Sequence, residues 1–283
     1  MSALPDRIRL VIFDLDGVIY RGAEPIEGAP ELVAALHAAG VAVRFATNNS
    51  MVEREGYVAR LDGMGIPTTV DEIVTSTSAT VEHLRRHAPH IRSVMAVGAD
   101  GMEAELRAAG LSVVMAGDPA MAEHAGGPLD RTFDAVVVGL DPRVDYLGLA
   151  VAMRAVLDGA RFIATNADSR YPTPAGFLPG AGSIVAALAT ATGATPEVIG
   201  KPSPAMFEAI LEACGVPASE AVVIGDNPEA DIAGAHRAGC AAILVLTGVA
   251  DAALAATLDG ERRPEAIAAD PRAVLALLEA RLS

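Results

Sequence analysis

The sequence contains only two cysteines, Cys214 and Cys240, among 283 residues. Two cysteines are too few for a disulfide framework, and a chain of this length can stabilise itself by burying apolar surface. The N-terminus lacks a basic segment followed by an apolar run, and the most hydrophobic stretches, such as 241–246, are far shorter than a membrane span. These absences predict a cytoplasmic protein with free thiols and no membrane partner.

Positive charge is also scarce. Arginine and lysine together number 21 against 36 aspartates and glutamates, the formal net charge is −15, and Lys201 is the single lysine. Nucleic-acid binding relies on clustered basic side chains that displace counterions, so we do not expect a nucleic-acid partner. The charge does not exclude a small anionic substrate, because one metal ion and one lysine can reverse the field inside a cleft.

The sequence does contain a repeated alternation of strand and helix signals. Short β-rich apolar runs end abruptly in polar residues at 10–13, 41–46, 221–224 and 241–246, the last of which runs into Thr247-Gly248. Between them lie alanine-rich segments with helical spacing that end at a glycine, for example 29–39 and 205–214. The alternation predicts an α/β fold with a Rossmann-like parallel-sheet core, in which ligands bind at the carboxyl ends of the strands.

The middle of the chain has strand candidates of its own, at 94–97, 113–114 and 135–138. Strands with polar ends lie on both sides of this region. We therefore expect a core domain made of residues 1–77 and 178–283, interrupted by an inserted α/β cap domain at 78–177.

Asp14 and Asp16 follow the first predicted strand with one residue between them, so a strand period of two directs both carboxylates to one face. Like charges this close are unfavourable unless a cation neutralises them or one of them holds a proton. The pair indicates a metal site, an acid–base role, or both. Because the same tetrapeptide also occurs in solvated turns, the other strand ends have to support this interpretation.

Uncharged donors suited to phosphoryl oxygens follow the second strand. These are Thr47, Asn48 and Asn49, and Ser50 is placed to cap the helix expected next. Lys201 lies in a restricted Gly-Lys-Pro turn, where its ammonium can neutralise charge on both a nucleophilic carboxylate and a transferring phosphoryl group. The alternatives are a capped turn and a solvent-facing lysine.

Two further acids, Asp226 and Asp231, follow the third strand. Mg²⁺ prefers oxygen ligands and keeps several waters, so two carboxylates, a backbone carbonyl and a substrate phosphate would complete an octahedral site. Asp226 is the better candidate ligand. Asp231 lies where a helix could begin, so it either ligates the metal, favours the helix dipole or orients a metal-bound water.

These pieces, in this order, resemble the haloacid dehalogenase (HAD) superfamily. The resemblance rests on Asp14-Leu15-Asp16-Gly17, then Thr47, Lys201, and Gly225-Asp226 with Asp231. It implies that Asp14 is the nucleophile, that Asp16 is the general acid–base, and that Thr47 and Lys201 bind phosphate. It further implies that Mg²⁺ takes Asp14, the Asp16 carbonyl and Asp226.

More narrowly, the chain is similar to the subfamily of p-nitrophenyl, phosphoglycolate and pyridoxal phosphatases and NagD-type nucleotidases, which has a large α/β cap. The similar segments are 16–22, 47–50, 138–141, 164–168, 179–182 and 199–202. The last motif departs from the pattern at Asn227, Pro228 and Glu229, which leaves its loop geometry open. Caps of this subfamily often mediate dimers, so the resemblance implies a homodimer through the cap.

The sequence thus predicts a Mg²⁺-dependent phosphatase that acts on a small phosphorylated metabolite through an aspartyl phosphate. A sugar or glycerol phosphate, phosphoglycolate, a nucleotide, pyridoxal phosphate and p-nitrophenyl phosphate all remain candidate substrates. Arg170 and Tyr171, near the end of the expected cap, are candidates for contacting the leaving group, and an ordinary exposed loop is the alternative.

Two other functions compete with hydrolysis. A phosphotransferase or mutase would pass the phosphoryl group to an alcohol, but only about thirty residues separate Asp16 from Thr47, where mutases of this superfamily usually insert a helical cap. A receiver-like switch would also gather acids, a threonine and a lysine around Mg²⁺. Such modules are usually far shorter and lack an acid two residues after the phosphorylated aspartate.

Overall fold

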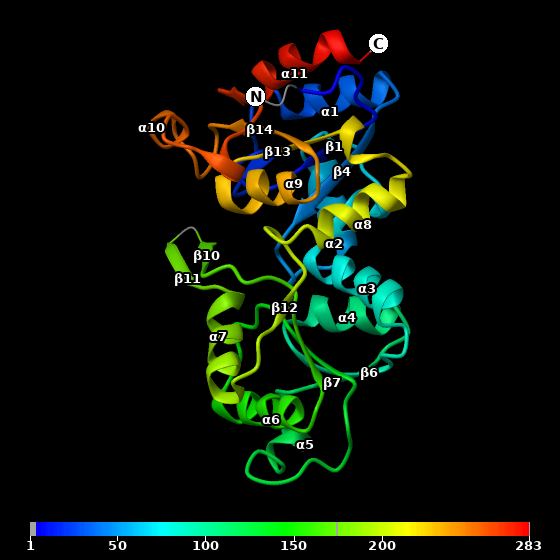
Figure 1. The fold of residues 1–283 in the computed structure, drawn as a ribbon, viewed down its shortest axis with the longest axis vertical. Coiled ribbons are helices and arrows are strands. Elements are labelled where there is room, and N and C mark those ends of the chain that lie inside the picture. The colour runs from blue at the N-terminus through cyan, green and yellow to red at the C-terminus, as the bar shows by residue number, and fades with distance from the viewer. Residues whose placement is uncertain (1–3, 174, 283) are drawn as a thin grey trace. The chain divides into compact units, whose positions relative to one another are not determined.

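The computed structural model describes residues 4–173 and 175–282, and the chain divides into two compact units (Figure 1). Unit 1 is Met1–Thr47, Arg54–Val74 and Lys201–Ser283, and unit 2 is Asn48–Glu53 and Thr75–Gly200. The return to the first unit thus comes at Lys201, whereas we expected it at residue 178. The assignment of unit 1 to a hydrolase core and of unit 2 to a cap stays a prediction.

Unit 1 is built on a six-stranded sheet with the order β15-β14-β13-β1-β4-β5. The pairings of β1 with β4 and β13, of β13 with β14, and of β14 with β15 are parallel. This confirms the predicted parallel-sheet α/β fold. The strands are β1 Leu10–Phe13, β4 Ala42–Thr47, β5 Ile73–Thr75, β13 Ala221–Gly225, β14 Ala241–Val245 and β15 Ala266–Ala268.

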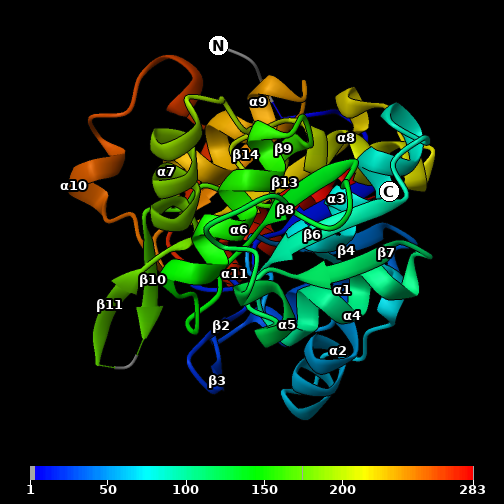
Figure 2. The ribbon, with the colours of Figure 1, turned by 90° about the horizontal axis from the view of Figure 1, so that it is seen from below.

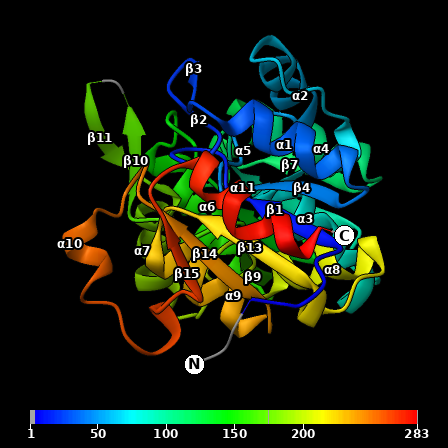
Figure 3. The same cartoon turned by 90° about the horizontal axis from the view of Figure 1, so that it is seen from above.

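Helices of unit 1 bury the apolar side chains of this sheet. Helix α1 (Ala29–Ala38) lies beside α11 (Pro271–Leu278), as Figure 3 shows, and both contribute leucines and valines to a cluster with alternate residues of β1 and β13. A short hairpin follows β1. The remaining elements are β2 Tyr20–Arg21, β3 Glu24–Pro25, α2 Arg54–Gly63, α8 Ala205–Cys214, α9 Gly234–Arg237, α10 Ala252–Ala255, and the short helical turns η1 Val70–Glu72, η2 Ala218–Glu220, η3 Pro228–Ala233, η4 Gly260–Arg262 and η5 Glu279–Arg281.

Unit 2 has its own five-stranded parallel sheet with the order β12-β9-β8-β6-β7, and Figure 2 shows β6 beside β8. Its strands are β6 Ser93–Val97, β7 Ser112–Met115, β8 Ala135–Val138, β9 Arg161–Ala164 and β12 Glu197–Val198. Its helices are α3 Ser76–His87, α4 Asp100–Ala108, α5 Pro119–Ala122, α6 Tyr146–Leu157 and α7 Ala181–Thr192. Strands β10 (Arg170–Thr173) and β11 (Gly176–Pro179) form a separate antiparallel pair.

Helix α7 explains why unit 2 extends beyond residue 177. Its buried side chains Ile184, Val185 and Leu188 pack in the cluster that covers one face of the unit 2 sheet, and β12 then pairs with β9. Both elements therefore belong to the second apolar core. Among the residues that the structure describes, no helix has the length and apolar character needed to span a bilayer.

Candidate active site

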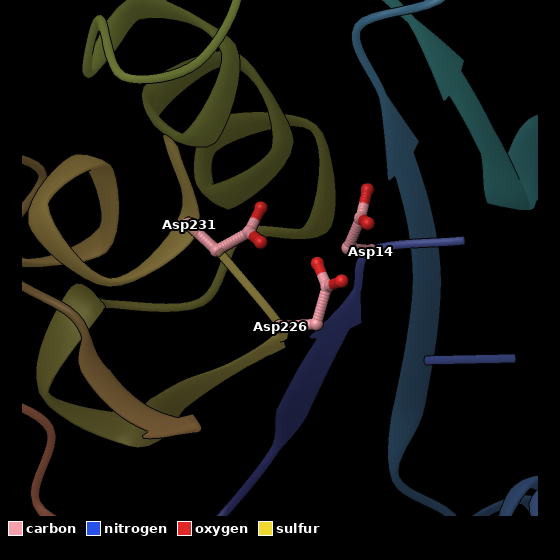
Figure 4. A group of neighbouring side chains, drawn as sticks. All are labelled: Asp14, Asp226 and Asp231. Carbon is pink, nitrogen blue, oxygen red and sulfur yellow. The ribbon is translucent and has the colours of Figure 1, made fainter. Parts of the chain in front are cut away.

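Three carboxylates of unit 1 converge at one edge of its sheet. Asp14 directly follows β1, Asp226 directly follows β13, and Asp231 lies in η3, and their side chains turn toward one another (Figure 4). Each offers an oxygen within 4.8 Å of the others. The sheet brings Asp14 and Asp226 together, because β1 and β13 are parallel neighbours. Phe13 lies opposite Ile224, so the two strands end at nearly the same level of the sheet.

The ammonium of Lys201 lies among these acids. Its Nζ is 2.5 Å from Asp14 Oδ1 and 2.8 Å from Asp231 Oδ1, and it also donates to the carbonyl of Ala46 at 3.0 Å. The lysine is only 3% exposed. Burial alone would lower the pKa of Lys201, but the two carboxylates raise it above its ordinary value, so the side chain stays charged at neutral pH.

The acids repel one another inside this buried site. Burial raises the pKa of Asp14 well above its usual range; Lys201 opposes this rise, and Asp231 and Asp226 add to it. Burial and the nearby Asp231 raise the pKa of Asp226 to about 7, although the backbone N–H of Val249 stabilises its charged form. The charged forms of Asp14 and Asp226 are therefore disfavoured in the site as it stands, and a bound cation would stabilise them.

The donor set fits Mg²⁺, because carboxylate oxygens are the hard ligands that this ion prefers. The two acids from the β13 edge differ in how they are already engaged. Asp226 Oδ2 accepts a hydrogen bond from Val249 N at 2.6 Å, whereas both oxygens of Asp231 have partners, Lys201 Nζ and the backbone N–H of Asn227 at 3.0 Å. In this structure Asp231 holds the ammonium of Lys201. Direct ligation of the metal by Asp231 stays a prediction.

Asp16 lies outside this group of three carboxylates. The strand period does not apply to Asp16, because β1 ends at Phe13 and the chain turns at Gly17, where φ is 81°. Its acid–base and metal-binding roles stay predictions. Its side chain is exposed. Burial raises the pKa of Asp16, and the positive charges of Arg60 and Lys201 oppose that rise.

Thr47 is the last residue of β4, is 4% exposed, and follows the carbonyl of Ala46 that accepts from Lys201. The next residues belong to unit 2. Asn48 Nδ2 donates to the carboxylate of Asp168 at 3.0 Å, and Asn49 Oδ1 accepts from the N–H of Met51 at 2.9 Å. Phosphate binding by Thr47, Asn48 and Asn49 stays a prediction.

Ser50 does not cap the next helix, so that expectation was wrong. Helix α2 begins only at Arg54, and the Ser50 hydroxyl instead accepts a hydrogen bond from the backbone N–H of Leu140 at 3.2 Å. Its hydroxyl is therefore used inside unit 2, where the side chain is buried.

Arg170 and Tyr171 lie on β10 of unit 2. Arg170 is exposed, and its guanidinium carbon lies 5.6 Å from the ring centroid of Phe177 on the paired strand β11. Tyr171 is partly buried. Their contact with a leaving group stays a prediction.

The unusual residues of the last motif form a well-defined start for η3, which is a π-helical turn. Asn227 Oδ1 accepts from the N–H groups of Glu229 and Ala230 at 3.0 and 3.1 Å, and Pro228 occupies the first helical position. Behind them, a Cβ on Gly225 would lie 2.2 Å from the Cβ of Asp231. Asn227 and Gly225 thus fix Asp231 beside β13.

Sequence reasoning missed the segment after β14, which contacts Asp226 through the N–H of Val249 and contacts Gly17 through the hydroxyl of Thr247. A signal was present, because the run 241–246 also ends in polar and small residues, as the other three strands do. Nothing in the sequence marks the backbone N–H of Val249 as a donor.

Comparisons with known proteins show which family the chain resembles. A family model described as haloacid dehalogenase-like hydrolase matches residues 11–112, and a second model, HAD-hydrolase-like, matches residues 198–273. The chain is 37% identical over 238 residues to an acid sugar phosphatase of Staphylococcus aureus, which covers 84% of this chain and 86% of that protein. It is 36% identical over 238 residues to a 5′-nucleotidase of Bacillus subtilis, with 84% and 87% of the two chains covered. The crystal structure of a glycerol phosphate phosphatase from Mycobacterium tuberculosis in complex with magnesium matches with a TM-score of 0.83 and 34% identity, covering 96% of this chain and 78% of that one.

Proposed function

This chain belongs to the haloacid dehalogenase-like hydrolases, and within them to the NagD-like phosphatases, and on that premise we propose that it hydrolyses small phosphate monoesters through a phosphorylated Asp14. It is a phosphoric monoester hydrolase with Mg²⁺ as its cofactor. The observation that carries the proposal is the meeting of Asp14, Lys201 and Asp226 at the carboxyl ends of β1 and β13.

Asp14 acts as the nucleophile in the first step. One of its oxygens forms a bond to phosphorus while the bond from phosphorus to the leaving alkoxide breaks, and Asp16 gives its proton to that alkoxide. The raised pKa of Asp16 suits this role, because it favours the protonated carboxyl that the first step needs. Lys201 holds Asp14 Oδ1 and offsets the negative charge brought by the phosphoryl group.

In the second step Asp16, now ionised, takes a proton from water as the water oxygen attacks phosphorus. The bond between phosphorus and Asp14 breaks, which releases inorganic phosphate and restores the carboxylate. Mg²⁺, when bound, supplies positive charge to the phosphoryl oxygens. Asp14, the Asp16 carbonyl and Asp226 would hold it, and Asp231 would keep Lys201 in place.

The finer parts of the proposal concern substrate, assembly and location. The names of the relatives support a sugar phosphate, a nucleotide or glycerol phosphate as the substrate class, with Arg170 and Tyr171 of unit 2 as candidate contacts. We keep a homodimer through unit 2 as part of the proposal. Cys214 and Cys240 are both free, which supports a cytoplasmic location.

No observation favours the two competing functions. Between β1 and β4 the chain forms only the β2–β3 hairpin and α1, rather than the helical cap expected of a mutase. A receiver-like switch does not account for unit 2 and its five-stranded sheet.

The test is hydrolysis of p-nitrophenyl phosphate and of a panel of sugar, glycerol and nucleoside monophosphates, measured as phosphate release with Mg²⁺. Asp14→Asn keeps the size of the side chain but removes the nucleophile, so we expect turnover to fall by at least about 1,000-fold. Asp6→Asn is the matched control at an exposed position and should behave as wild type. Wild-type turnover by Asp14→Asn would refute the mechanism.

A further inference from the structure

The segment that follows β14 contacts two loops of unit 1 that carry proposed Mg²⁺ ligands. The hydroxyl of Thr247 donates to the carbonyl oxygen of Gly17 at 2.5 Å, and the backbone N–H of Val249 donates to Asp226 Oδ2 at 2.6 Å. Gly17 directly follows Asp16 in the chain. Residues 247–249 therefore bridge the Asp16–Gly17 turn and the Asp226 carboxylate.

The Asp16–Gly17 turn, segment 247–249 and the Asp226 side chain pack in direct contact. A Cβ on Gly248 would lie 1.7 Å from Asp226 Oδ2, and a Cβ on Gly17 would lie 2.4 Å from the same oxygen and 2.9 Å from Gly248 Cα. Only glycine fits at both positions, since carbon atoms do not approach oxygen this closely without a bond. Direct contact between the backbone of these glycines and Asp226 thus sets how close the loops come.

Gly17 is held on both sides of its α carbon. Its N–H donates to the carbonyl of Tyr20 at 2.8 Å, which orients the peptide plane that also carries the Asp16 carbonyl. Its own carbonyl accepts from Thr247, and Arg21 in turn donates to the carbonyl of Thr247. The Asp16 carbonyl is thereby held in a fixed relation to segment 247–249, and through that segment to Asp226.

We propose that Thr247 is a positioning residue for Mg²⁺, whose hydroxyl fixes the spacing between the Asp16 carbonyl and the Asp226 carboxylate. Thr247 acts through Gly17 and does not itself contact the reacting atoms. Its contribution is preorganisation of the ligands, and groups that hold metal ligands in this way commonly change metal affinity by about 10- to 100-fold when removed. The inference rests on the proposed function in one respect, that Mg²⁺ binds at Asp14, Asp16 and Asp226.

Thr247→Val tests the inference, because valine has nearly the shape of threonine and lacks the donor. Metal-free protein is titrated with Mg²⁺ by calorimetry, and we expect a dissociation constant about 10-fold above that of the wild type. The Mg²⁺ concentration for half-maximal hydrolysis of p-nitrophenyl phosphate should rise by the same factor, while kcat at saturating Mg²⁺ stays within about twofold. Thr247→Ser retains the hydroxyl and should restore the affinity.

Thr257→Val is the matched control, because the Thr257 hydroxyl also donates to a backbone carbonyl, that of Leu254 at 2.8 Å, but does so on the exposed surface. The inference is overturned if Thr247→Val binds Mg²⁺ within about twofold of the wild type, if Thr257→Val weakens binding equally, or if serine fails to restore it. Should the valine variant not fold, Thr247→Ala is measured in the same way. A wild type that binds no Mg²⁺ and releases no phosphate would refute the proposed function instead.

Discussion

Lys201 is the residue on which the charge balance of the site depends. It contacts Asp14 and Asp231 within a buried environment, where its side chain is 4% exposed and that of Asp231 is 1% exposed. Removing one partner from a buried ion pair leaves a charge that neither water nor protein compensates. The same change at a surface pair has little effect, because water replaces the lost partner.

Lys201→Met should therefore lower both stability and activity. We expect the free energy of unfolding to fall by about 3 kcal/mol, as measured by urea titration without metal. Turnover of p-nitrophenyl phosphate at saturating Mg²⁺ should fall by at least about 100-fold, because the charge that offsets the phosphoryl group is lost. Arg85→Met, which removes an exposed partner of Glu82, is the control and should leave both nearly unchanged. A Lys201→Met protein as stable as the wild type would contradict the buried-pair argument.

At the scale of single residues, the sequence reveals ionisable side chains better than their surroundings. The sequence indicates Asp14 and Asp226 because each follows a buried strand, and Lys201 because it is the single lysine and lies in a Gly-Lys-Pro turn. It does not indicate Thr247, because threonine is common at strand ends and its bond to Gly17 joins residues 230 positions apart. The sequence also did not predict that Asp16 lies outside the group of three carboxylates, since the strand period holds only as far as Phe13.

At the scale of elements, η3 is the structure that ties Asp231 to the site. Its start depends on Asn227, whose side chain accepts from two backbone N–H groups. Asn227→Ala should lower the free energy of unfolding by about 1 kcal/mol, the usual value of such a cap. Because Asp231 would lose the geometry that holds Lys201, kcat should also fall by about 10-fold.

Asp270→Ala is the control for this prediction within unit 1. Asp270 caps α11 by accepting from the N–H of Ala273 at 2.9 Å, and its loss should cost about 1 kcal/mol as well. It should leave turnover unchanged, since α11 packs on α1 and on β14 and β15. Equal loss of turnover in both variants, compared by urea titration and steady-state kinetics, would mean that η3 has no special role.

The elements themselves were predictable where a clear apolar pattern ended at a turn or polar residue. The expected helix at 205–214 is α8 without any shift, and the expected strand at 10–13 is β1. The border of the insert could not be predicted in the same way. The apolar stripe of α7 indicates a helix with one buried face, but the pattern does not tell which of two sheets that face covers.

At the scale of the whole molecule, each unit has its own sheet and its own apolar cluster. Regions with separate cores can open independently. The effect of a ligand on the hydrogen exchange of one unit can therefore be compared with that of the other unit in the same chain. Asp14, Asp16, Lys201, Asp226 and Asp231 all belong to unit 1. The sequence predicts two units. Because these five residues all lie in unit 1, unit 2 can serve as an internal control.

Mg²⁺ should therefore protect unit 1 selectively in hydrogen exchange. At about 100 times its dissociation constant, an ion that binds only the folded state stabilises it by about 2.7 kcal/mol. We expect slower exchange in peptides that cover 14–20, 225–231 and 247–250, while β6 and β8 of unit 2 exchange at unchanged rates. Asp226→Asn should abolish the difference, because it removes a ligand charge. Equal protection of β6 and β8 would show that the ion also stabilises unit 2, and would contradict a metal site built from unit 1 alone.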